Sequence, residues 1–452
     1  MGPQRGGQLH PSGGGNRCLV LPGKEFLISG CRLLIEEKGQ PATRSIVVRE
    51  GRIERIIRQH EESDFSALER IDAKGLTALP GLVDAHVHFR EPGYCHKEDW
   101  LTGSRAAASG GATTVLEMPN TRPATLTRQE LERKRVLAAK SVVDYGFHLG
   151  ASLARPMELN DSATLSNVAG VKFYFDQSNG DPWIPAFGSG RMRVIGMLRA
   201  VARNAGIAVL HAKGSSLSSG LELARHASCP ALVAHTPGRE ELAHIARARS
   251  FARAAVHCEV TPHHLFLSQR EARRLGEFAE ADPPLCTPAD RQVLWHALNN
   301  GIVDTIASDH SPHTAAEKAL GGHAGFAGLE TMLPLLLDAR YRGLISLGDI
   351  QRLCCENPAR IFHLERKGRI APGYDADIVL ADLRRMARVE NCALKTKCGW
   401  SPFHGRRLRG WPAMTFVRGQ LVFSDGEILA PERGGTRREV RYASRQAAQP
   451  ED

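Results

Sequence analysis

The stretch that decides the expected fold is Leu82-Val83-Asp84-Ala85-His86-Val87-His88. It is short and mostly apolar, as a strand buried in a core is. Residues i and i+2 of a strand point to the same side, so His86 and His88 face the same way. Two imidazoles on one face are natural ligands for zinc or a similar metal, although such a pair alone is a weak signal. We therefore expect a buried strand that ends in a pair of candidate metal ligands.

The sequence from residue 80 to residue 364 repeats one pattern. Short β-like runs alternate with helix-compatible segments such as 128–139 and 291–300. The runs that follow the first strand are 112–116, 170–175, 208–211, 232–235, 256–260 and 305–308. Repeated βα units over this length predict an α/β fold with a (β/α)₈ TIM-like barrel. The alternative is an open doubly wound sheet, which would carry a glycine-rich phosphate loop after its first strand, and this sequence has none.

Both flanks of the barrel region contain short predicted strands. In residues 25–79 the runs lie at 28–30, 32–35, 45–48 and 53–57. In residues 365–433 they lie at 368–370, 377–380, 414–417 and 421–423. Strands from the two ends of a chain can pair with each other, so we expect these two regions to form one small β-sandwich domain beside the barrel.

The outermost residues lack the pattern of packed elements. Residues 1–24 are rich in glycine and proline and lack the apolar segment of a secretory signal, so we expect a disordered leader. Residues 434–452 are polar and rich in Arg, Gln and Ala, which predicts a disordered tail. Ten cysteines occur without a Cys-x-x-Cys pair, which is typical of reduced and mostly buried thiols. Together these features favour a cytoplasmic protein.

The chain is basic, with 59 Lys and Arg residues against 49 Asp and Glu and a net charge of +10. The basic residues are spread along the chain and form no zinc-finger or RNA-binding pattern, so we expect no nucleic-acid partner. No run approaches the ~18 apolar residues of a membrane span, so we expect no membrane partner either. A small anionic substrate is compatible with this charge.

Polar residues stand at or near the ends of several predicted strands. Lys172 lies in the apolar run 171–175, where a bare ammonium is costly to bury. His211 and His235 close their runs, and Asp309 follows another. One histidine at a strand end is usually structural, and one lysine in such a run usually extends its amine to solvent or a partner. Four histidines, a lysine and an aspartate in this order on successive strands favour a metal centre instead.

This ordered set resembles the amidohydrolase superfamily, whose barrels hold two metal ions. The resemblance implies two divalent metals, expected to be Zn²⁺, with Lys172 carboxylated by CO₂ as the bridge between them. The implied ligands are, for one metal, His86, His88 and Asp309 and, for the other, His211 and His235. An anionic carbamate also removes the cost of a buried ammonium. In one bacterial branch an aspartate near the position of Asp176 forms the bridge, but Lys172 remains the preferred bridge here.

The flanking motifs narrow the resemblance to the dihydroorotase family. They are His86-Val87-His88-Phe89-Arg90-Glu91-Pro92-Gly93, Met118-Pro119-Asn120-Thr121-Arg122-Pro123, Cys258-Glu259-Val260-Thr261-Pro262-His263-His264 and Asp309-His310-Ser311-Pro312-His313. The match runs from about residue 80 to residue 403. It implies reversible hydrolysis of dihydroorotate to N-carbamoyl-L-aspartate, a step of pyrimidine biosynthesis, with Asp309 passing the proton.

The same resemblance includes the form embedded in the animal multifunctional pyrimidine-synthesis protein. It therefore suggests aspartate transcarbamoylase as a partner, and we also expect a homo-oligomer. The substrate-contacting residues that it implies are Arg90, Asn120, Asp282 and His313. Dihydroorotate carries a ring carboxylate, and the planar fork of Arg90 suits that group.

Three positions depart from the family pattern. Asp282 and Cys286 replace the Asn and Arg of an Asn-Pro-Pro-Leu-Arg motif, and Asp282 would set a negative charge near an anionic substrate. Lys213 stands where an acidic residue often follows the third histidine, which removes an acceptor for a metal-binding imidazole.

Allantoinase, dihydropyrimidinase and a non-catalytic scaffold for aspartate transcarbamoylase stay open as alternatives. His263 and His264 are expected to be framework residues.

Overall fold

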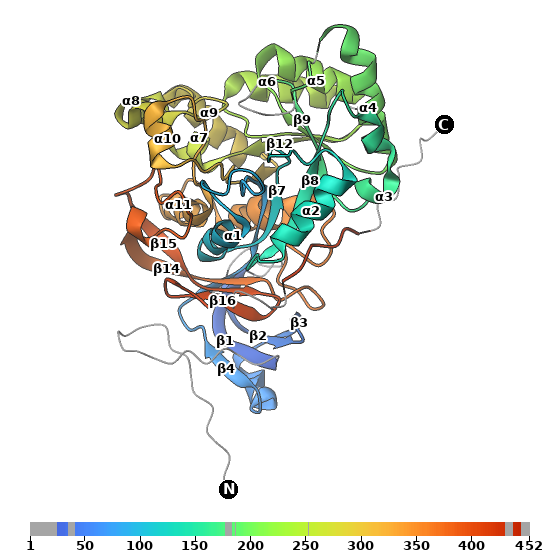
Figure 1. Cartoon of the computed structure of the whole chain (residues 1–452). Helices are drawn as coiled ribbons and strands as arrows, with labels where there is room; N and C mark the ends of the chain where they lie inside the picture. The colour runs from blue at the N-terminus through green and yellow to red at the C-terminus, as the bar shows by residue number, and fades with distance from the viewer. Residues whose placement is uncertain are drawn as a thin grey trace.

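The central sheet of the computed structural model consists of eight parallel strands. They are β6 (Leu82–Val87), β7 (Ala112–Glu117), β8 (Asp144–Gly150), β9 (Gly170–Tyr174), β10 (Ala208–His211), β11 (Ala231–Val233), β12 (Val256–Val260) and β13 (Thr305–Ile306), and each pairs with the next. Val87 also forms a parallel bridge to His310, just beyond the last strand. This bridge brings the two edges of the sheet together into a nearly closed barrel (Figure 1), which confirms the predicted fold class.

The structure describes residues 25–34, 41–176, 183–185, 187–251, 253–429 and 437–443. The predicted leader at 1–24 and most of the predicted tail lie outside them. None of the helices in these ranges has the length and apolar character that a membrane span requires.

Barrel strands form where the sequence can be buried on both faces. All six residues of β7 and all seven of β8 are buried, as expected for strands covered by helices on one side and by the barrel interior on the other. β8 was not among the predicted strands, because two glycines, an aspartate and a histidine dilute its apolar pattern.

Helices cover the outside of the barrel (Figure 1). The longer ones are α1 (Trp100–Ser109), α2 (Arg128–Ala138), α4 (Arg191–Arg203), α5 (Gly214–His226), α6 (Arg239–Ser250), α9 (Pro288–Asn299) and α11 (Leu329–Tyr341). The shorter ones are α3 (Ser162–Leu165), α7 (Pro262–Phe266), α8 (Gln269–Leu275), α10 (Ala315–Leu320), α12 (Leu347–Gln351) and α13 (Asn357–Ile361). Side chains at several helix starts accept hydrogen bonds from free backbone amides, as Asp99 does for α1 and Thr127 for α2.

Strands from both ends of the described chain make a second, mixed sheet. They are β1 (Glu25–Leu34), β2 (Pro41–Arg49), β3 (Arg52–Ile57), β4 (Glu69–Asp72), β5 (Thr77–Pro80), β14 (Ile378–Arg388), β15 (Arg407–Val417), β16 (Gln420–Ser424) and β17 (Glu427–Ile428). The pairing of β5 with β14 joins the two ends, and Figure 1 shows the blue and orange-red strands side by side. The rings of Phe26 and Phe416 stack 5.7 Å apart although two strands separate β1 from β15, so the sheet folds over its own core.

Two local predictions for this region need correction. The predicted strand at 368–370 is a bend followed by irregular chain, because Gly368 has a φ of 83° and lies against the carbonyl of Cys355. Residues 437–443, predicted as part of a disordered tail, are ordered and form bridges from Glu439 to Tyr145 and from Tyr442 to Leu364. The alternation of Val440 and Tyr442, both packed in one apolar cluster, was hidden by the polar composition around them.

A buried group of charged residues lies where the barrel meets the small sheet, at the end where the barrel strands begin. We call it the base cluster, and it consists of Asp144, Lys367, Asp375, Asp377 and Arg418. Lys367 Nζ contacts all three carboxylates, and Arg418 pairs with two of them. Asp144 belongs to the barrel and Arg418 follows the last residue of β15, so the cluster ties the two parts together.

Candidate active site

The opposite end of the barrel, where the strands finish, holds a cavity with an empty volume of about 580 Å³, open to solvent. All ten residues predicted for the site line it: His86, His88, Arg90, Asn120, Lys172, His211, His235, Asp282, Asp309 and His313. They come from the ends of different strands, where active sites of barrel enzymes lie. The structure thus brings the predicted residues together, while their individual roles stay predictions.

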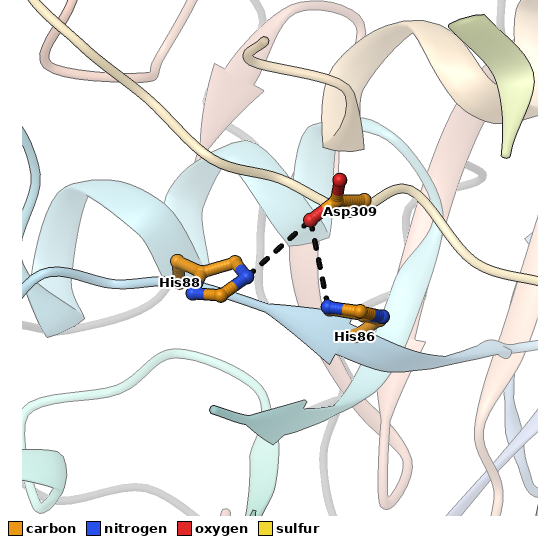
Figure 2. A group of neighbouring side chains, drawn as sticks. All are labelled: His86, His88 and Asp309. Carbon is orange, nitrogen blue, oxygen red and sulfur yellow. Dashed lines mark ion pairs between the residues drawn. The ribbon is translucent and has the colours of Figure 1, made fainter. Parts of the chain in front are cut away.

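The first candidate metal group consists of His86, His88 and Asp309 (Figure 2). Asp309 Oδ1 lies 3.5 Å from His86 Nε2 and 3.3 Å from His88 Nε2. Figure 2 shows both imidazoles turned from β6 and the residue after it towards the aspartate on the facing loop. Burial lowers the pKa of His86 to about 3 and that of His88 to about 4. Both rings are therefore neutral at pH 7 and offer a nitrogen lone pair.

Two side chains hold these imidazoles from behind. Glu259 Oε1 lies 2.8 Å from His86 Nδ1 and accepts a hydrogen bond of 3.0 Å from the backbone N–H of His235. Asn120 Oδ1 lies 2.6 Å from His88 Nδ1. With protons on the Nδ1 atoms, both Nε2 lone pairs face Asp309 and the cavity, as metal-binding histidines require. The sequence left Glu259 without a role, although a carboxylate at the end of a buried strand was a usable signal.

The second candidate metal group is the pair His211 and His235. His211 Nδ1 and His235 Nε2 lie 2.9 Å apart, and both rings are buried. Burial holds the pKa of His235 well below its ordinary value, so this ring is neutral. Lys172 is also buried and its Nζ lies 5.4 Å from the centre of the Tyr174 ring.

The backbone of the site is held in unusual conformations at three of these positions. Arg90, His235 and Asp309 have φ values of 61°, 38° and 45°, in the left-handed region that side chains with a Cβ rarely adopt. Such conformations persist where the surrounding structure enforces them, and they cluster at functional sites. They aim the three side chains into the cavity that they line.

The donor atoms of both groups fit divalent metal ions. Neutral imidazole nitrogens and a carboxylate oxygen are the ligands that zinc and similar metals take in proteins. His86, His88 and Asp309 each offer one such atom, and these atoms lie within 4.8 Å of one another.

Asp176 does not point to this centre. Its Oδ2 accepts hydrogen bonds of 2.7 Å from the backbone N–H of Lys213 and 2.7 Å from the hydroxyl of Ser216, at the start of α5. It is not among the residues that line the cavity. This geometry favours Lys172 over Asp176 as the residue between the two groups.

Asp282, whose charge was expected to disturb an anionic substrate, has two partners. Its Oδ1 accepts a hydrogen bond of 2.7 Å from Lys213 Nζ, and its Oδ2 lies 3.4 Å from His211 Nε2. Asp282 thus places a carboxylate beside His211, although Lys213 stands where the family often has an acidic residue. Cys286 is half-buried and does not line the cavity.

The wall beside the first group is positively charged. Arg90 is buried, donates from Nε to the carbonyl of Pro312 at 3.2 Å, and brings a terminal guanidinium nitrogen 3.1 Å from His313 Nε2. His313 Nδ1 lies 3.1 Å from Lys97 Nζ. Burial, together with Arg90 and Lys97, lowers the pKa of His313 to about 2, so this ring adds no charge at pH 7. Lys97 was not among the residues predicted for the site.

The remaining histidines of the motifs make structural contacts. His264 contacts the Thr261 hydroxyl at 2.9 Å through Nδ1 and the Pro283 carbonyl at 3.2 Å through Nε2. His263 packs on Phe326 with ring centres 5.1 Å apart. His310 Nε2 lies 3.2 Å from Glu98 Oε2. None of these histidines lines the cavity, in agreement with the framework role expected for His263 and His264.

Residues 77–422 match the amidohydrolase family, and the chain belongs to it. It is 37% identical over 403 residues to the dihydroorotase of Halobacterium salinarum, covering 80% of this chain and 93% of that one. It is also 37% identical over 414 residues to the dihydroorotase of Methanothermobacter thermautotrophicus, covering 86% and 92%. Within the amidohydrolases, the chain therefore belongs to the dihydroorotase family.

Two further similarities bear on the assignment. The chain is 32% identical over 379 residues to the multifunctional protein CAD of Squalus acanthias, which covers 80% of this chain but 16% of that protein. Among solved structures, an L-hydantoinase (dihydropyrimidinase) from Arthrobacter aurescens superposes with a TM-score of 0.83 at 26% identity, covering 90% of this chain and 98% of that one.

Proposed function

We propose that this protein is a dihydroorotase that interconverts dihydroorotate and N-carbamoyl-L-aspartate by hydrolysis and ring closure. It is a cyclic amide hydrolase of the amidohydrolase family. The observation that carries the choice of substrate is the position of Arg90 and His313 in the same cavity as His86, His88 and Asp309. A fixed guanidinium beside a candidate metal centre suits a substrate with a carboxylate on the ring that is cut.

The proposed cofactor is a pair of divalent metals, expected to be Zn²⁺. His86, His88 and Asp309 would hold one ion, His211 and His235 the other, and carboxylated Lys172 would lie between them. A buried ammonium beside two cations would repel both, whereas a carbamate on Lys172 Nζ would attract them. When bound, the metals supply a Lewis acid that activates water and polarises the ring carbonyl.

Asp309 is the proposed proton carrier. Its Oδ1 accepts a hydrogen bond of 2.8 Å from the Ser311 hydroxyl, which fixes the orientation of the carboxylate. In hydrolysis it would take the proton of the attacking water and deliver it to the ring nitrogen that leaves. In ring closure the same carboxylate would take the proton from that nitrogen.

Arg90, Asn120 and His313 are the proposed contacts of the substrate carboxylate. The Asn120 oxygen faces His88, so its amide N–H₂ remains to donate into the cavity. Asp282, expected from the sequence as a substrate contact, lines the same cavity, and its two partners reduce the repulsion that it would exert on an anion.

The test is a comparison of substrates with the purified, metal-loaded protein. We expect turnover of dihydroorotate and none of allantoin or dihydrouracil. The opposite preference would assign the chain to another cyclic amidohydrolase activity, which the similarity to a hydantoinase structure keeps as the second candidate. Metal analysis after reconstitution tests the cofactor: about two ions per chain are expected, and less than one would favour a non-catalytic scaffold.

The proposal extends to a cytoplasmic homo-oligomer that associates with aspartate transcarbamoylase. The similarity to part of a multifunctional protein supports the association. Sedimentation of the purified chain, alone and mixed with aspartate transcarbamoylase, tests both points. A monomer that does not sediment with the transferase would contradict them.

A further inference from the structure

Two positions at which the chain departs from its family pattern meet in the structure. Lys213 and Asp282 are 69 residues apart in sequence, yet Lys213 Nζ donates to Asp282 Oδ1 at 2.7 Å. The side chain of Asp282 is 18% exposed and that of Lys213 is 41% exposed, so the pair lies at the rim of the cavity. A lysine side chain with this exposure could instead extend into solvent, so the contact with Asp282 is a specific one.

The second oxygen of Asp282 reaches a candidate metal ligand. Asp282 Oδ2 lies 3.4 Å from His211 Nε2, while the other ring nitrogen, His211 Nδ1, faces His235 Nε2 at 2.9 Å. A carboxylate at Nε2 favours the tautomer with the proton on Nε2. The lone pair of His211 is then on Nδ1 and points towards His235, where the second metal is proposed.

The backbone of Lys213 is held in place by hydrogen bonds at the start of α5. Lys213 precedes α5, and its backbone N–H donates to Asp176 Oδ2 at 2.7 Å. The Ser216 hydroxyl oxygen lies 2.7 Å from the same carboxylate oxygen and 2.8 Å from the Lys213 carbonyl oxygen, so its one proton has two acceptors within reach. With its backbone held at the helix start, the Lys213 side chain has a short path to the Asp282 carboxylate.

We propose that Lys213 and Asp282 act together as positioning residues for His211. Asp282 accepts from Nε2 and sets the tautomer and ring orientation, and Lys213 orients Asp282 and compensates its charge. This inference rests on the proposed metal-dependent function. Carboxylates behind metal-binding histidines commonly change metal affinity by ~10–100-fold when removed. Lys213 and Asp282, which both differ from the family pattern, therefore act as one pair.

The experiment measures the histidine ring and the metal directly. In the metal-free protein, ring ¹⁵N chemical shifts of His211 are expected to indicate a proton on Nε2, and Asp282→Ala is expected to shift the proton towards Nδ1. In competition with a chelator, the same variant is expected to bind Zn²⁺ about 10–100-fold more weakly. Asp282→Asn keeps an acceptor oxygen. Its His211 ring shifts and Zn²⁺ affinity are expected to lie closer to those of the natural protein than to those of Asp282→Ala.

Lys213→Met tests the pairing. If Lys213 acts through Asp282, Lys213→Met changes the His211 ring shifts in the natural background and leaves them unchanged in the Asp282→Ala background. The control is Glu222→Gln on α5. It breaks a more exposed pair with Arg191 (3.0 Å) away from the cavity and is expected to change neither readout.

Unchanged ring shifts and Zn²⁺ affinity in folded Asp282→Ala would overturn the proposal. A rise in KM for dihydroorotate without either change would overturn it as well and make Asp282 a substrate contact. Neither readout depends on the substrate, so a failure of the dihydroorotase assignment would be seen separately, as absent turnover by the unmodified protein.

Discussion

The two ends of the barrel each bury a group of side chains of the types that bind metal ions, but only the group at the base is filled by a protein cation in contact with every carboxylate. In the base cluster, Asp144, Asp375 and Asp377 come close enough together to hold a metal ion. The Lys367 ammonium occupies that position instead, 2.6 Å from Asp377 and 3.2 Å from Asp375. Arg418 adds contacts of 2.7 Å to Asp144 and 2.8 Å to Asp375. The base cluster is complete without a ligand.

The mouth of the barrel has the opposite arrangement. His86, His88 and Asp309 converge, and they line an open cavity together with the buried Lys172. Burial keeps the imidazoles neutral, so the group offers lone pairs and one negative charge. The comparison teaches that proximity of ligand-type residues does not define a metal site. What distinguishes the mouth is that its donor atoms face an open cavity.

The largest expected effect comes from the mouth. Asp309→Asn keeps the shape of the side chain and tolerates the φ of 45°, so the fold is expected to persist. The carboxamide cannot carry the proton and is a poorer metal ligand, so kcat for dihydroorotate is expected to fall by about 10³- to 10⁴-fold. Steady-state kinetics and a thermal melt of the same preparation check this. Near-normal kcat in a folded variant would remove Asp309 from the chemistry.

The base cluster is expected to affect stability instead. Lys367→Met leaves three buried carboxylates with one cation fewer, and removal of one partner from such a buried group costs about 3–5 kcal/mol. We expect the free energy of unfolding, measured with urea, to fall by this amount. The kcat of the protein that remains folded is expected to be unchanged. Arg239→Met breaks the more exposed pair with Asp290 (2.6 Å) and is the control, with an expected cost below about 1 kcal/mol. Loss of activity in stable Lys367→Met would break the contrast between the two ends.

The sequence was sufficient where the information is local. His86 and His88 could be predicted to face the same way because two residues of one strand determine it. The barrel followed from repeated units, and the ten cavity residues followed from motifs whose resemblance covers most of the chain. Each of these depends on residues close together in sequence.

The parts that sequence reasoning missed depend on residues far apart. Glu259 supports His86 from 173 residues away, and Lys97 reaches His313 across 216 residues. The pairing of Lys213 with Asp282 turned two apparent defects into one contact, which no local pattern could indicate. Such contacts become visible only when the strand order around the barrel is known.

A smaller effect at the mouth tests the substrate side. Arg90→Met removes a charged hydrogen-bonding group from the cavity, and such bonds contribute about 1.5–3 kcal/mol. KM for dihydroorotate is therefore expected to rise roughly 10–100-fold, with a smaller change in kcat. Arg90→Lys keeps the charge but loses the planar guanidinium. Its KM is expected to lie between those of the natural protein and Arg90→Met. An unchanged KM in Arg90→Met would remove this residue from the carboxylate site.

The smallest expected effect concerns the pH dependence of stability at the mouth. The pKa of His313 is lowered from its ordinary value of 6.5 to about 2 by burial and by Arg90 and Lys97, with Glu317 the acidic group nearby. Because the folded ring stays neutral while the unfolded ring takes a proton, its stabilising contribution is present above pH 6.5 and is lost as the pH falls. His313→Gln removes this term, so the stability of the variant should depend less steeply on pH between 6.5 and 5, by about 1 kcal/mol per pH unit. Urea unfolding of the metal-loaded proteins at several pH values measures the difference. Parallel curves for the two proteins would mean that His313 titrates in the folded state, and that the cation-lined wall at the mouth is more solvated than its contacts indicate.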